Sequence, residues 1–298
     1  MSKFKEKYYD FVVSDFDGTI FTTSKIVTKT TVDAINSFIN RGGTFCVCTG
    51  RMTKSILKML NKFGLTQGFV ISYNGAEITE VATGTKVYKN HIDNENAVKV
   101  LQYAENNGLT VLVYPNDEVT SQYPVESVLD YFKLSECGGN ILNSKVSEYF
   151  IKNNLTTGKI LFLTGGNDGV SNKILNDLPK IIGNDFNIVR SNPYHIDITK
   201  KGVSKGDTIK KLANLLGKSM KKLVCFGDQM NDESMMRVAS LALVTENGSQ
   251  KLKDLCDGVI ESCDDDGVRK AIEKYCIWKK TFNFTCLCKQ NMLLYNMY

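Results

Sequence analysis

Short apolar runs alternate with amphipathic segments at both ends of the chain, and this alternation restricts the possible fold more than any other feature. Near the N-terminus, apolar runs at residues 8–14, 44–48 and 69–72 are separated by segments whose apolar side chains recur at helical spacing. Strands that alternate with helices form parallel sheets with right-handed crossovers. The same pattern returns after residue 204, so two separated parts of the sequence predict one α/β domain.

The stretch between these two parts follows a different pattern. A hairpin is expected over residues 77–90, a strand pair over residues 186–198, and prolines and glycines interrupt the chain between them. The stretch has roughly 110 residues, which is enough for a domain of its own. We therefore predict a second domain inserted into the first.

The predicted boundaries follow from where the pattern changes. The core domain is expected to comprise residues 1–82 and 192–276, and the inserted domain residues 83–191. The last residues, 277–298, combine aromatic, cysteine and methionine side chains without a clear period, and we assign them no function.

Composition excludes several classes of function. The net charge of +5 comes without a block of basic residues, so it indicates a solvated, lysine-rich surface and no nucleic-acid interface. No apolar run approaches the roughly 20 residues that span a bilayer, which argues against a membrane protein. The nine cysteines form no C-x-x-C pair, and no signal-peptide pattern opens the chain. We therefore expect a cytoplasmic protein with reduced thiols and no zinc site.

Acidic residues follow apolar strands at two separated places in the sequence. Asp15 and Asp17 come directly after the first strand, and Asp228 and Asp232 follow the strand expected at residues 222–226. Because the carboxyl ends of parallel strands meet at one edge of a sheet, these side chains should converge there. A group of carboxylates attracts a hard divalent cation, and ligands that are all oxygen favour Mg²⁺. A carboxylate can also attack phosphorus, and a second carboxylate nearby can move protons.

Phosphoryl transfer further requires positive charge and hydrogen-bond donors around the phosphoryl oxygens. Thr49 and Gly50, at the end of the second strand, offer a hydroxyl and backbone amides at the start of a helix. Lys205, one residue into its helix, offers an ammonium group, and Asn231 offers a side-chain amide. The sequence thus provides a nucleophile, metal ligands and a counter-charge without using a histidine.

These residues lie in four short motifs that together resemble the haloacid dehalogenase (HAD) superfamily of phosphatases. In chain order the motifs are DFDGT at 15–19, CTGR at 48–51, KG at 205–206 and GDQMND at 227–232. The residues at 71–76 and 202–206 are similar to the Cof-type branch, subfamily IIB, which carries a large cap between the second and third motifs. The resemblance covers about residues 8–275 and implies a Rossmann-like parallel-sheet core with an inserted α/β cap domain.

The resemblance also implies an activity, a cofactor and the two reacting groups. It implies a magnesium-dependent phosphatase that hydrolyses small phosphorylated metabolites, such as sugar phosphates, through an aspartyl-phosphate. Asp15 would be the nucleophile and Asp17 the general acid and base. Mg²⁺ would be held by the Asp15 carboxylate, the main-chain carbonyl of Asp17 and Asp228, while Asp232 would act through water or orient the metal's surroundings.

The same resemblance implies contacts with the phosphoryl group, for which the expected residues are Thr49, Gly50, Lys205 and Asn231. Asn247 lies where the family pattern departs from this sequence, and no role is carried over to it. For Arg51, a structural ion pair and a substrate contact remain equal alternatives. His91 and His195 are expected to be packed or surface residues.

Two other functions remain open from the sequence. A phosphomutase would return the phosphate to a sugar, whereas a phosphatase would accumulate inorganic phosphate. A catalytically silent binding or regulatory protein would carry a lesion in one motif, and Asp15, Asp17, Thr49, Lys205 and Asp228 are all present. The expected partner is a small phosphorylated metabolite.

Overall fold

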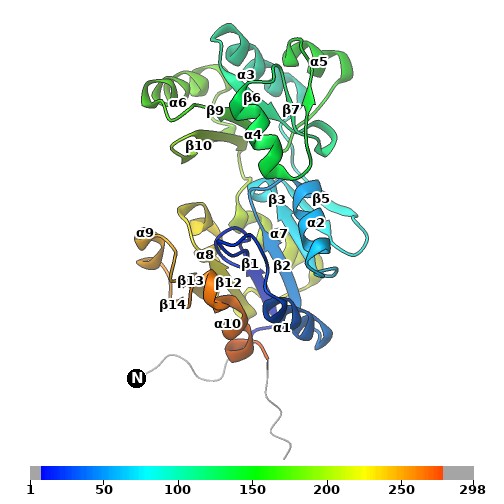
Figure 1. Ribbon diagram of the computed structural model, residues 1–298, viewed down its shortest axis with the longest axis vertical. Coiled ribbons are helices and arrows are strands. Elements are labelled where there is room, and N and C mark those ends of the chain that lie inside the picture. The colour runs from blue at the N-terminus through cyan, green and yellow to red at the C-terminus, as the bar shows by residue number, and fades with distance from the viewer. Residues whose placement is uncertain (1–7, 278–298) are drawn as a thin grey trace, which may run out of the picture.

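The computed structural model describes residues 8–277 and divides them between two β-sheets (Figure 1). The larger, core sheet has eight strands: β1 (Phe11–Ser14), β2 (Thr44–Cys48), β3 (Phe69–Ser72), β4 (Glu77–Glu80), β5 (Lys86–Lys89), β12 (Leu223–Gly227), β13 (Leu241–Thr245) and β14 (Gly258–Ile260). Their order across the sheet is β14-β13-β12-β1-β2-β3-β4-β5, and only β4 and β5 run antiparallel to their neighbours. The predicted α/β core with a parallel sheet is confirmed.

Helices cover this sheet, and in two of them a side chain caps the N-terminus. The core helices are α1 (Lys29–Asn40), α2 (Thr53–Lys62), α7 (Lys205–Leu216), α8 (Glu233–Met236), α9 (Gln250–Lys253) and α10 (Gly267–Tyr275). Thr28 Oγ1 accepts the N–H of Thr31 at the start of α1, and Ser204 Oγ accepts the N–H of Asp207 at the start of α7. Gly217, at φ 62°, ends α7 in the left-handed region that favours glycine.

Alternate residues of the central strand β1 pack on opposite faces of the core sheet. Val12 joins apolar side chains of α1, α2 and α10, whereas Phe11 and Val13 join side chains of α7 and α8. All three residues are fully buried. A strand that is covered on both faces carries a continuous apolar run, which explains why β1 stands out in the sequence.

The smaller sheet belongs to a second part of the molecule, residues 94–200, which we call the cap. Its elements are α3 (Asn94–Asn106), β6 (Thr110–Val113), β7 (Thr120–Ser121), α4 (Glu126–Ser135), β8 (Asn140–Ile141), α5 (Val146–Asn153), β9 (Ile160–Leu163), α6 (Asp168–Ile182), β10 (Phe186–Asn192) and β11 (His195–Lys200). The strand order is β10-β11-β9-β6-β7-β8. Val100, Phe150 and Ile174, from α3, α5 and α6, join one apolar cluster with the sheet, while α4 packs on the side nearer the core (Figure 1).

The cap sheet begins and ends later in the chain than the boundaries proposed from the sequence, 83–191. β5 pairs with β4 in the core sheet, and β11 pairs with β9 and β10 in the cap sheet. The chain therefore passes between the two parts near residues 90–93 and 201–204. A hairpin is a local feature that a sequence reveals, but which sheet receives its strands depends on pairing with distant residues.

Two cap helices, α4 and α5, were not among the expected elements. The prolines and glycines around them indicated an irregular stretch. Pro124 lies outside α4, just before its N-cap Val125, so its missing N–H interrupts no hydrogen bond of the helix. Val128 is fully buried, so α4 is stabilised by its packing on the cap sheet more than by its local sequence.

Ile277 is the last described residue, so nearly all of the predicted tail, 277–298, lies outside the described residues. Within residues 8–277, no helix is both long and apolar enough to cross a membrane.

A buried carboxylate lies where the core meets the cap. Glu77, the first residue of β4, accepts hydrogen bonds from Thr53 Oγ1 at 2.6 Å and Lys86 Nζ at 2.9 Å. His91 Nε2 lies 2.7 Å from the Glu77 carboxylate, and His91 Nδ1 lies 3.3 Å from the Thr156 hydroxyl of the cap. Burial by itself raises the pKa of Glu77, but His91, Thr53 and Lys86 outweigh it and lower that pKa to about 2.

This lowered pKa makes the stability of the fold depend on pH. Because the pKa of Glu77 falls from 4.5 to about 2 on folding, its stabilisation is complete above pH 4.5 and is lost as the pH falls towards 2. We expect Glu77→Gln to be roughly 3 kcal/mol less stable at pH 7 and to lose less stability between pH 4.5 and 2. Urea unfolding at several pH values measures both effects. Glu95→Gln, in an exposed ion pair with Lys99, is the control. Equal stability and equal pH dependence of the two variants would show that Glu77 does not stabilise the fold in this way.

Candidate active site

The residues after β1 turn across the carboxyl edge of the core sheet. Asp15 donates its N–H to the carbonyl of Phe226 at 2.8 Å, which fixes it against β12, and its side chain is buried. Gly18 has φ +75°, and a Cβ at this position would lie 2.5 Å from Asp228 Oδ2. The turn therefore requires glycine both for its backbone conformation and for the close approach of a carboxylate.

Three buried carboxylates meet at this edge. Asp15, Asp228 and Asp232 each contribute one carboxylate oxygen, and these three oxygens lie within 4.8 Å of one another. The structure thus brings together acidic residues that are more than 200 positions apart in the sequence, as expected for neighbouring parallel strands.

A single ammonium group lies between two of these carboxylates. Lys205 Nζ is 2.5 Å from Asp15 Oδ1 and 2.6 Å from Asp232 Oδ1, and all three side chains are buried. Burial alone lowers the pKa of Lys205, but Asp15 and Asp232 outweigh it and raise that pKa above its usual value. Burial also raises the pKa of Asp15, and the neighbouring carboxylates add to this, against the effect of Lys205. The lysine therefore stays charged at neutral pH.

Asp232 uses both of its oxygens within the protein. Oδ1 accepts from Lys205, and Oδ2 accepts the N–H of Asp228 at 2.9 Å and the N–H of Gln229 at 3.3 Å. Its side chain is fully buried and does not line the cavity described below. Asp232 is therefore placed to hold Lys205 and the turn after β12.

Within residues 8–277, no lysine or arginine forms an ion pair with Asp228. Burial and then Asp232 raise the pKa of Asp228 to about 6. Together with Asp15 it presents hard oxygen ligands beside the turn at Gly18, and the one nearby ammonium does not balance three carboxylates. This donor set fits a Mg²⁺ ion.

Asp17 faces a different partner. Arg51 Nε lies 2.8 Å from Asp17 Oδ2, and Arg51 Nη2 lies 2.6 Å from Asp17 Oδ1, so the pair is bidentate. The guanidinium also lies 5.6 Å and 5.8 Å from the ring centroids of Phe16 and Phe21. Of the two alternatives for Arg51, the structure shows the ion pair.

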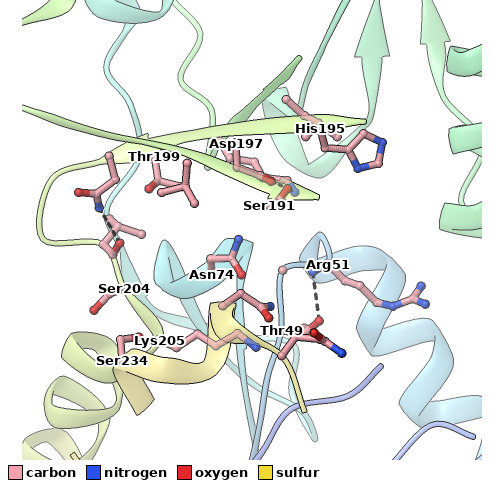
Figure 2. A pocket seen from close by; sticks show the side chains of 18 of the residues that line it. Thr49, Arg51, Asn74, Ser191, His195, Asp197, Thr199, Ser204, Lys205 and Ser234 are labelled. Atoms are coloured by element: carbon pink, nitrogen blue, oxygen red, sulfur yellow. Dashed lines mark hydrogen bonds and ion pairs between the residues drawn. The ribbon is translucent and has the colours of Figure 1, made fainter. Parts of the chain in front are cut away.

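The turn after β2 provides hydrogen-bonding groups beside these carboxylates. Thr49 is buried, and its hydroxyl accepts the N–H of Arg51 at 3.2 Å (Figure 2). A Cβ at Gly50 would lie 3.0 Å from Asn74 Oδ1, so this glycine leaves room for the Asn74 amide. Asn74 has a left-handed backbone, at φ 57°, and among the described residues its buried Oδ1 has no hydrogen-bond partner.

Most of these groups open into one cavity of about 1340 Å³ between the core and the cap. Of the site residues predicted from the sequence, only Asp232 does not line this cavity. The lining ones are Asp15, Asp17, Thr49, Gly50, Lys205, Asp228 and Asn231. Figure 2 shows Thr49, Asn74 and Lys205 on the core side and His195, Asp197 and Thr199 on the cap side, facing each other.

Several lining residues were missed from the sequence. Asn74 was noted only within residues 71–76, where the resemblance gave it no role, and neither Lys159 nor Asp197 was singled out. His195 was expected to be a packed or surface residue, but it lines the cavity. The signal for the β11 residues was the alternation in His195-Ile196-Asp197-Ile198-Thr199, which places polar side chains on one face of a strand.

Asn247, to which no role was carried over, supports the turn at Gly18. Its Nδ2 donates to the Gly18 carbonyl at 2.8 Å, and its Oδ1 accepts the N–H of Cys263 at 2.9 Å. The side chain therefore ties the residues after β1 to those after β14.

Carboxylates and a buried lysine at the carboxyl edge of a parallel sheet, beneath a second α/β part, are the features of a capped hydrolase with a Rossmann-like core. Residues 12–272 match the family model of the haloacid dehalogenase-like hydrolases, and the chain belongs to that family. The resemblance found from the sequence motifs is thus confirmed, as is the expectation of an enzyme.

Individual relatives agree along nearly their whole length. The chain is 28% identical over 283 residues to a protein named "Putative phosphatase" from Buchnera aphidicola subsp. Schizaphis graminum, covering 92% of this chain and 98% of the relative. The fold of this chain is similar to that of TM0651 from Thermotoga maritima, with a TM-score of 0.80 and 24% sequence identity. The match covers 91% of this chain and 98% of TM0651. It is also similar to BT4131, described as a HAD subclass IIB sugar phosphatase, with a TM-score of 0.73, 21% identity and coverage of 89% and 98%.

Removing the ammonium from this site should destabilise the fold. Lys205→Met would leave Asp15 and Asp232 buried without a cation, which typically costs about 3–5 kcal/mol. Lys210→Met, on the same helix but in a half-exposed pair with Asp207, should change the stability by no more than about 0.5 kcal/mol. Urea unfolding at pH 7 compares the two. Similar losses for both variants would show that Lys205 does not neutralise this site.

Proposed function

We propose that the protein is a magnesium-dependent phosphatase that hydrolyses small monoesters, sugar phosphates among them, through an aspartyl-phosphate on Asp15. The observation that carries the proposal is the Asp15 carboxylate, which lines the cavity beside Asp228 and is held by Lys205. The chain belongs to a family of hydrolases, and the relatives described as phosphatases support phosphate esters as the substrates of this protein.

Mg²⁺ would be held by the carboxylates of Asp15 and Asp228, together with the main-chain carbonyl of Asp17. When bound, it would supply a Lewis acid for a phosphoryl oxygen. We assign Asp232 to positioning, because both of its oxygens already accept hydrogen bonds from Lys205 and from main-chain amides.

In the proposed reaction, an Asp15 carboxylate oxygen attacks phosphorus. The bond between phosphorus and the ester oxygen breaks, and the leaving oxygen takes a proton from Asp17. Water then attacks the phosphorus, and Asp17 accepts a proton from that water. The bond between phosphorus and the Asp15 oxygen breaks, which regenerates the carboxylate and releases inorganic phosphate. Asp17 has to exchange its Arg51 contact for the reacting oxygens, because each of its oxygens already accepts an N–H from Arg51.

The remaining lining groups have the chemistry to hold the phosphoryl oxygens. Thr49 offers a hydroxyl, Gly50 a main-chain amide, Asn231 an amide group and Lys205 a charge beside the nucleophile. The ammonium of Lys205 also keeps the Asp15 carboxylate oriented. We propose these four residues as the phosphate-binding set.

The cap would limit the access of bulk water during the reaction. At the C-terminal end of α4, the Ser135 carbonyl accepts from Ser55 Oγ at 2.7 Å, and the Glu136 carbonyl accepts from Lys58 Nζ at 2.6 Å. Carbonyls at a helix end have no partner within the helix, so these donors from α2 satisfy them. The contacts fasten the cap to the helix that follows the phosphate-binding turn.

The thiols are consistent with a reducing location. All seven cysteines between residues 8 and 277 are free, and five of them are buried: Cys46, Cys48, Cys225, Cys263 and Cys276. Free thiols persist where glutathione and thioredoxin keep them reduced. We therefore propose a cytoplasmic location.

The nucleophile and the metal can be tested together by phosphate release from p-nitrophenyl phosphate and a panel of sugar phosphates. We expect release to require Mg²⁺, to stop with a chelator and to fall by at least about 10³-fold in Asp15→Asn, which removes the nucleophile at little packing cost. Asp33→Asn, in an exposed pair with Lys29, should keep wild-type activity. Release that survives the chelator, or an Asp15→Asn variant as active as Asp33→Asn, would refute this mechanism.

The contacts between α2 and the cap can be tested separately. Lys58→Met removes the donor to the Glu136 carbonyl, and we expect kcat/KM to fall about 3- to 10-fold, in proportion to one hydrogen bond from a charged donor. Lys62→Met, on the exposed side of the same helix, is the control. Steady-state kinetics on one sugar phosphate gives the comparison, and equal kinetics of the two variants would show that this contact does not hold the cap.

A further inference from the structure

The wall of the cavity opposite the acidic cluster contains a buried ion pair. Lys159 Nζ lies 2.8 Å from Asp197 Oδ1, and the two side chains are only 6% and 9% exposed. Both line the cavity, and Figure 2 shows Asp197 on the cap side, across from Thr49 and Lys205. The established family and the proposed reaction leave this pair without a role.

The alternation of β11 explains how the pair reaches the cavity. Ile196 and Ile198 are fully buried against the cap helices, so Asp197, between them, points to the opposite face of the sheet. Asp197 pairs in register with Leu161 of the adjacent strand β9, and Lys159 lies just before that strand. Helix α4 covers part of this face, and the polar residues occupy the part that lines the cavity.

A buried ion pair is a poor way to stabilise a fold, because desolvation offsets most of the attraction. It is, however, a suitable way to bind hydroxyl groups. Among the described residues, the Lys159 ammonium has a single hydrogen-bond acceptor, Asp197, and it lies 5.6 Å from the Tyr114 ring centroid. The Asp197 carboxylate accepts from Lys159 and from the Ser191 side chain. The pair therefore has both a donor and an acceptor to offer to a ligand.

The charges around the cavity restrict what that ligand can be. Each lysine and arginine that lines it is within ion-pair distance of a carboxylate of the protein: Arg51, Lys159, Arg190, Lys205 and Arg237. Burial lowers the pKa of His195, and the neighbouring Asp197 acts in the other direction. Arg51, which the proposed reaction frees from Asp17, lies on the core side beside Thr49 (Figure 2), whereas the cations on the cap wall stay paired and Asp197 would repel a second anionic group there.

We infer that Lys159 and Asp197 select the leaving group of the substrate, and that this group is uncharged and rich in hydroxyls, as in a sugar or polyol monophosphate. The inference rests on the proposed phosphatase activity and adds the residues and the charge rule that determine which monoesters are hydrolysed. Each hydroxyl donates to the carboxylate or accepts from the ammonium. A carboxylate or second phosphate on the leaving group meets Asp197 and finds no unpaired cation on the cap wall.

Two substrates that differ in a single group provide the test. Sorbitol 6-phosphate carries a hydroxymethyl group where 6-phosphogluconate carries a carboxylate. We expect wild-type kcat/KM to be at least about 10-fold higher for sorbitol 6-phosphate, and p-nitrophenyl phosphate, which has no hydroxyls on its leaving group, reports the core chemistry alone. Equal kcat/KM for the two substrates would overturn the inference, whatever the behaviour of the variants.

The variant Asp197→Asn separates recognition from a structural role. It should lower kcat/KM for sorbitol 6-phosphate about 10- to 100-fold and leave p-nitrophenyl phosphate within about 3-fold. It should also raise the activity on 6-phosphogluconate relative to that on sorbitol 6-phosphate. Lys159 loses its carboxylate partner in this variant and becomes available to the carboxylate of 6-phosphogluconate. Asp130→Asn, in an exposed pair with Lys133 on α4, is the matched control. An equal fall on all three substrates would assign Asp197 to the fold of the cap and overturn its role in selection.

The proposed activity is judged by a separate measurement. Release from p-nitrophenyl phosphate that disappears in Asp15→Asn supports the phosphatase mechanism independently of the cap. If wild-type protein releases no phosphate from any of the three compounds, the proposed function fails and the inference fails with it. If p-nitrophenyl phosphate is hydrolysed but the two six-carbon substrates are not distinguished, only the inference fails.

Discussion

The arrangement of the whole site depends on one buried ammonium group between two carboxylates. Lys205 can reach Asp15 and Asp232 because α7 begins at Ser204 and approaches α8 closely at Gly206, where a Cβ would lie 2.1 Å from the Ser234 carbonyl oxygen. One positive charge balances part of the negative charge, and Asp228 remains with a pKa raised to about 6. The fold thus holds carboxylates together at a cost that a bound cation would offset.

The ion pairs around the cavity differ in what they leave available. Asp232 is saturated by Lys205 and two amides, so it fixes geometry and offers nothing to a ligand. The Lys159–Asp197 pair has fewer partners and lies on the opposite wall, from a different sheet. The core therefore supplies groups suited to a phosphoryl group, and the cap supplies groups suited to the rest of the molecule. Such a division lets cap residues vary while the reacting groups stay in place.

The sequence allowed the parallel-sheet core and the place of several candidate residues at its carboxyl edge to be predicted, because these residues follow strong apolar strands or, like Lys205, begin a capped helix. Asp15, Thr49 and Asp228 could be assigned to one edge of a sheet from local pattern and the parallel-sheet rule alone. The pairing of Lys159 with Asp197 could not, since it depends on the register between β9 and β11 and on which face of the cap sheet meets the core. The Arg51–Asp17 contact was likewise one of two equal alternatives until the two turns were placed side by side.

Helix α2 links the two halves of the site. The turn that precedes it carries Thr49 and Arg51, and its first two turns carry Ser55 and Lys58, which hold the end of α4. A phosphoryl group bound at Thr49 and a cap fastened at Ser55 therefore act on the same short, rigid element. Because Arg51 also holds Asp17, a displacement of this element on substrate binding would change the position of the proposed acid and the cap together. In the proposed reaction, release of Asp17 from Arg51 and closure of the cap over the leaving group are thus expected to be coupled steps.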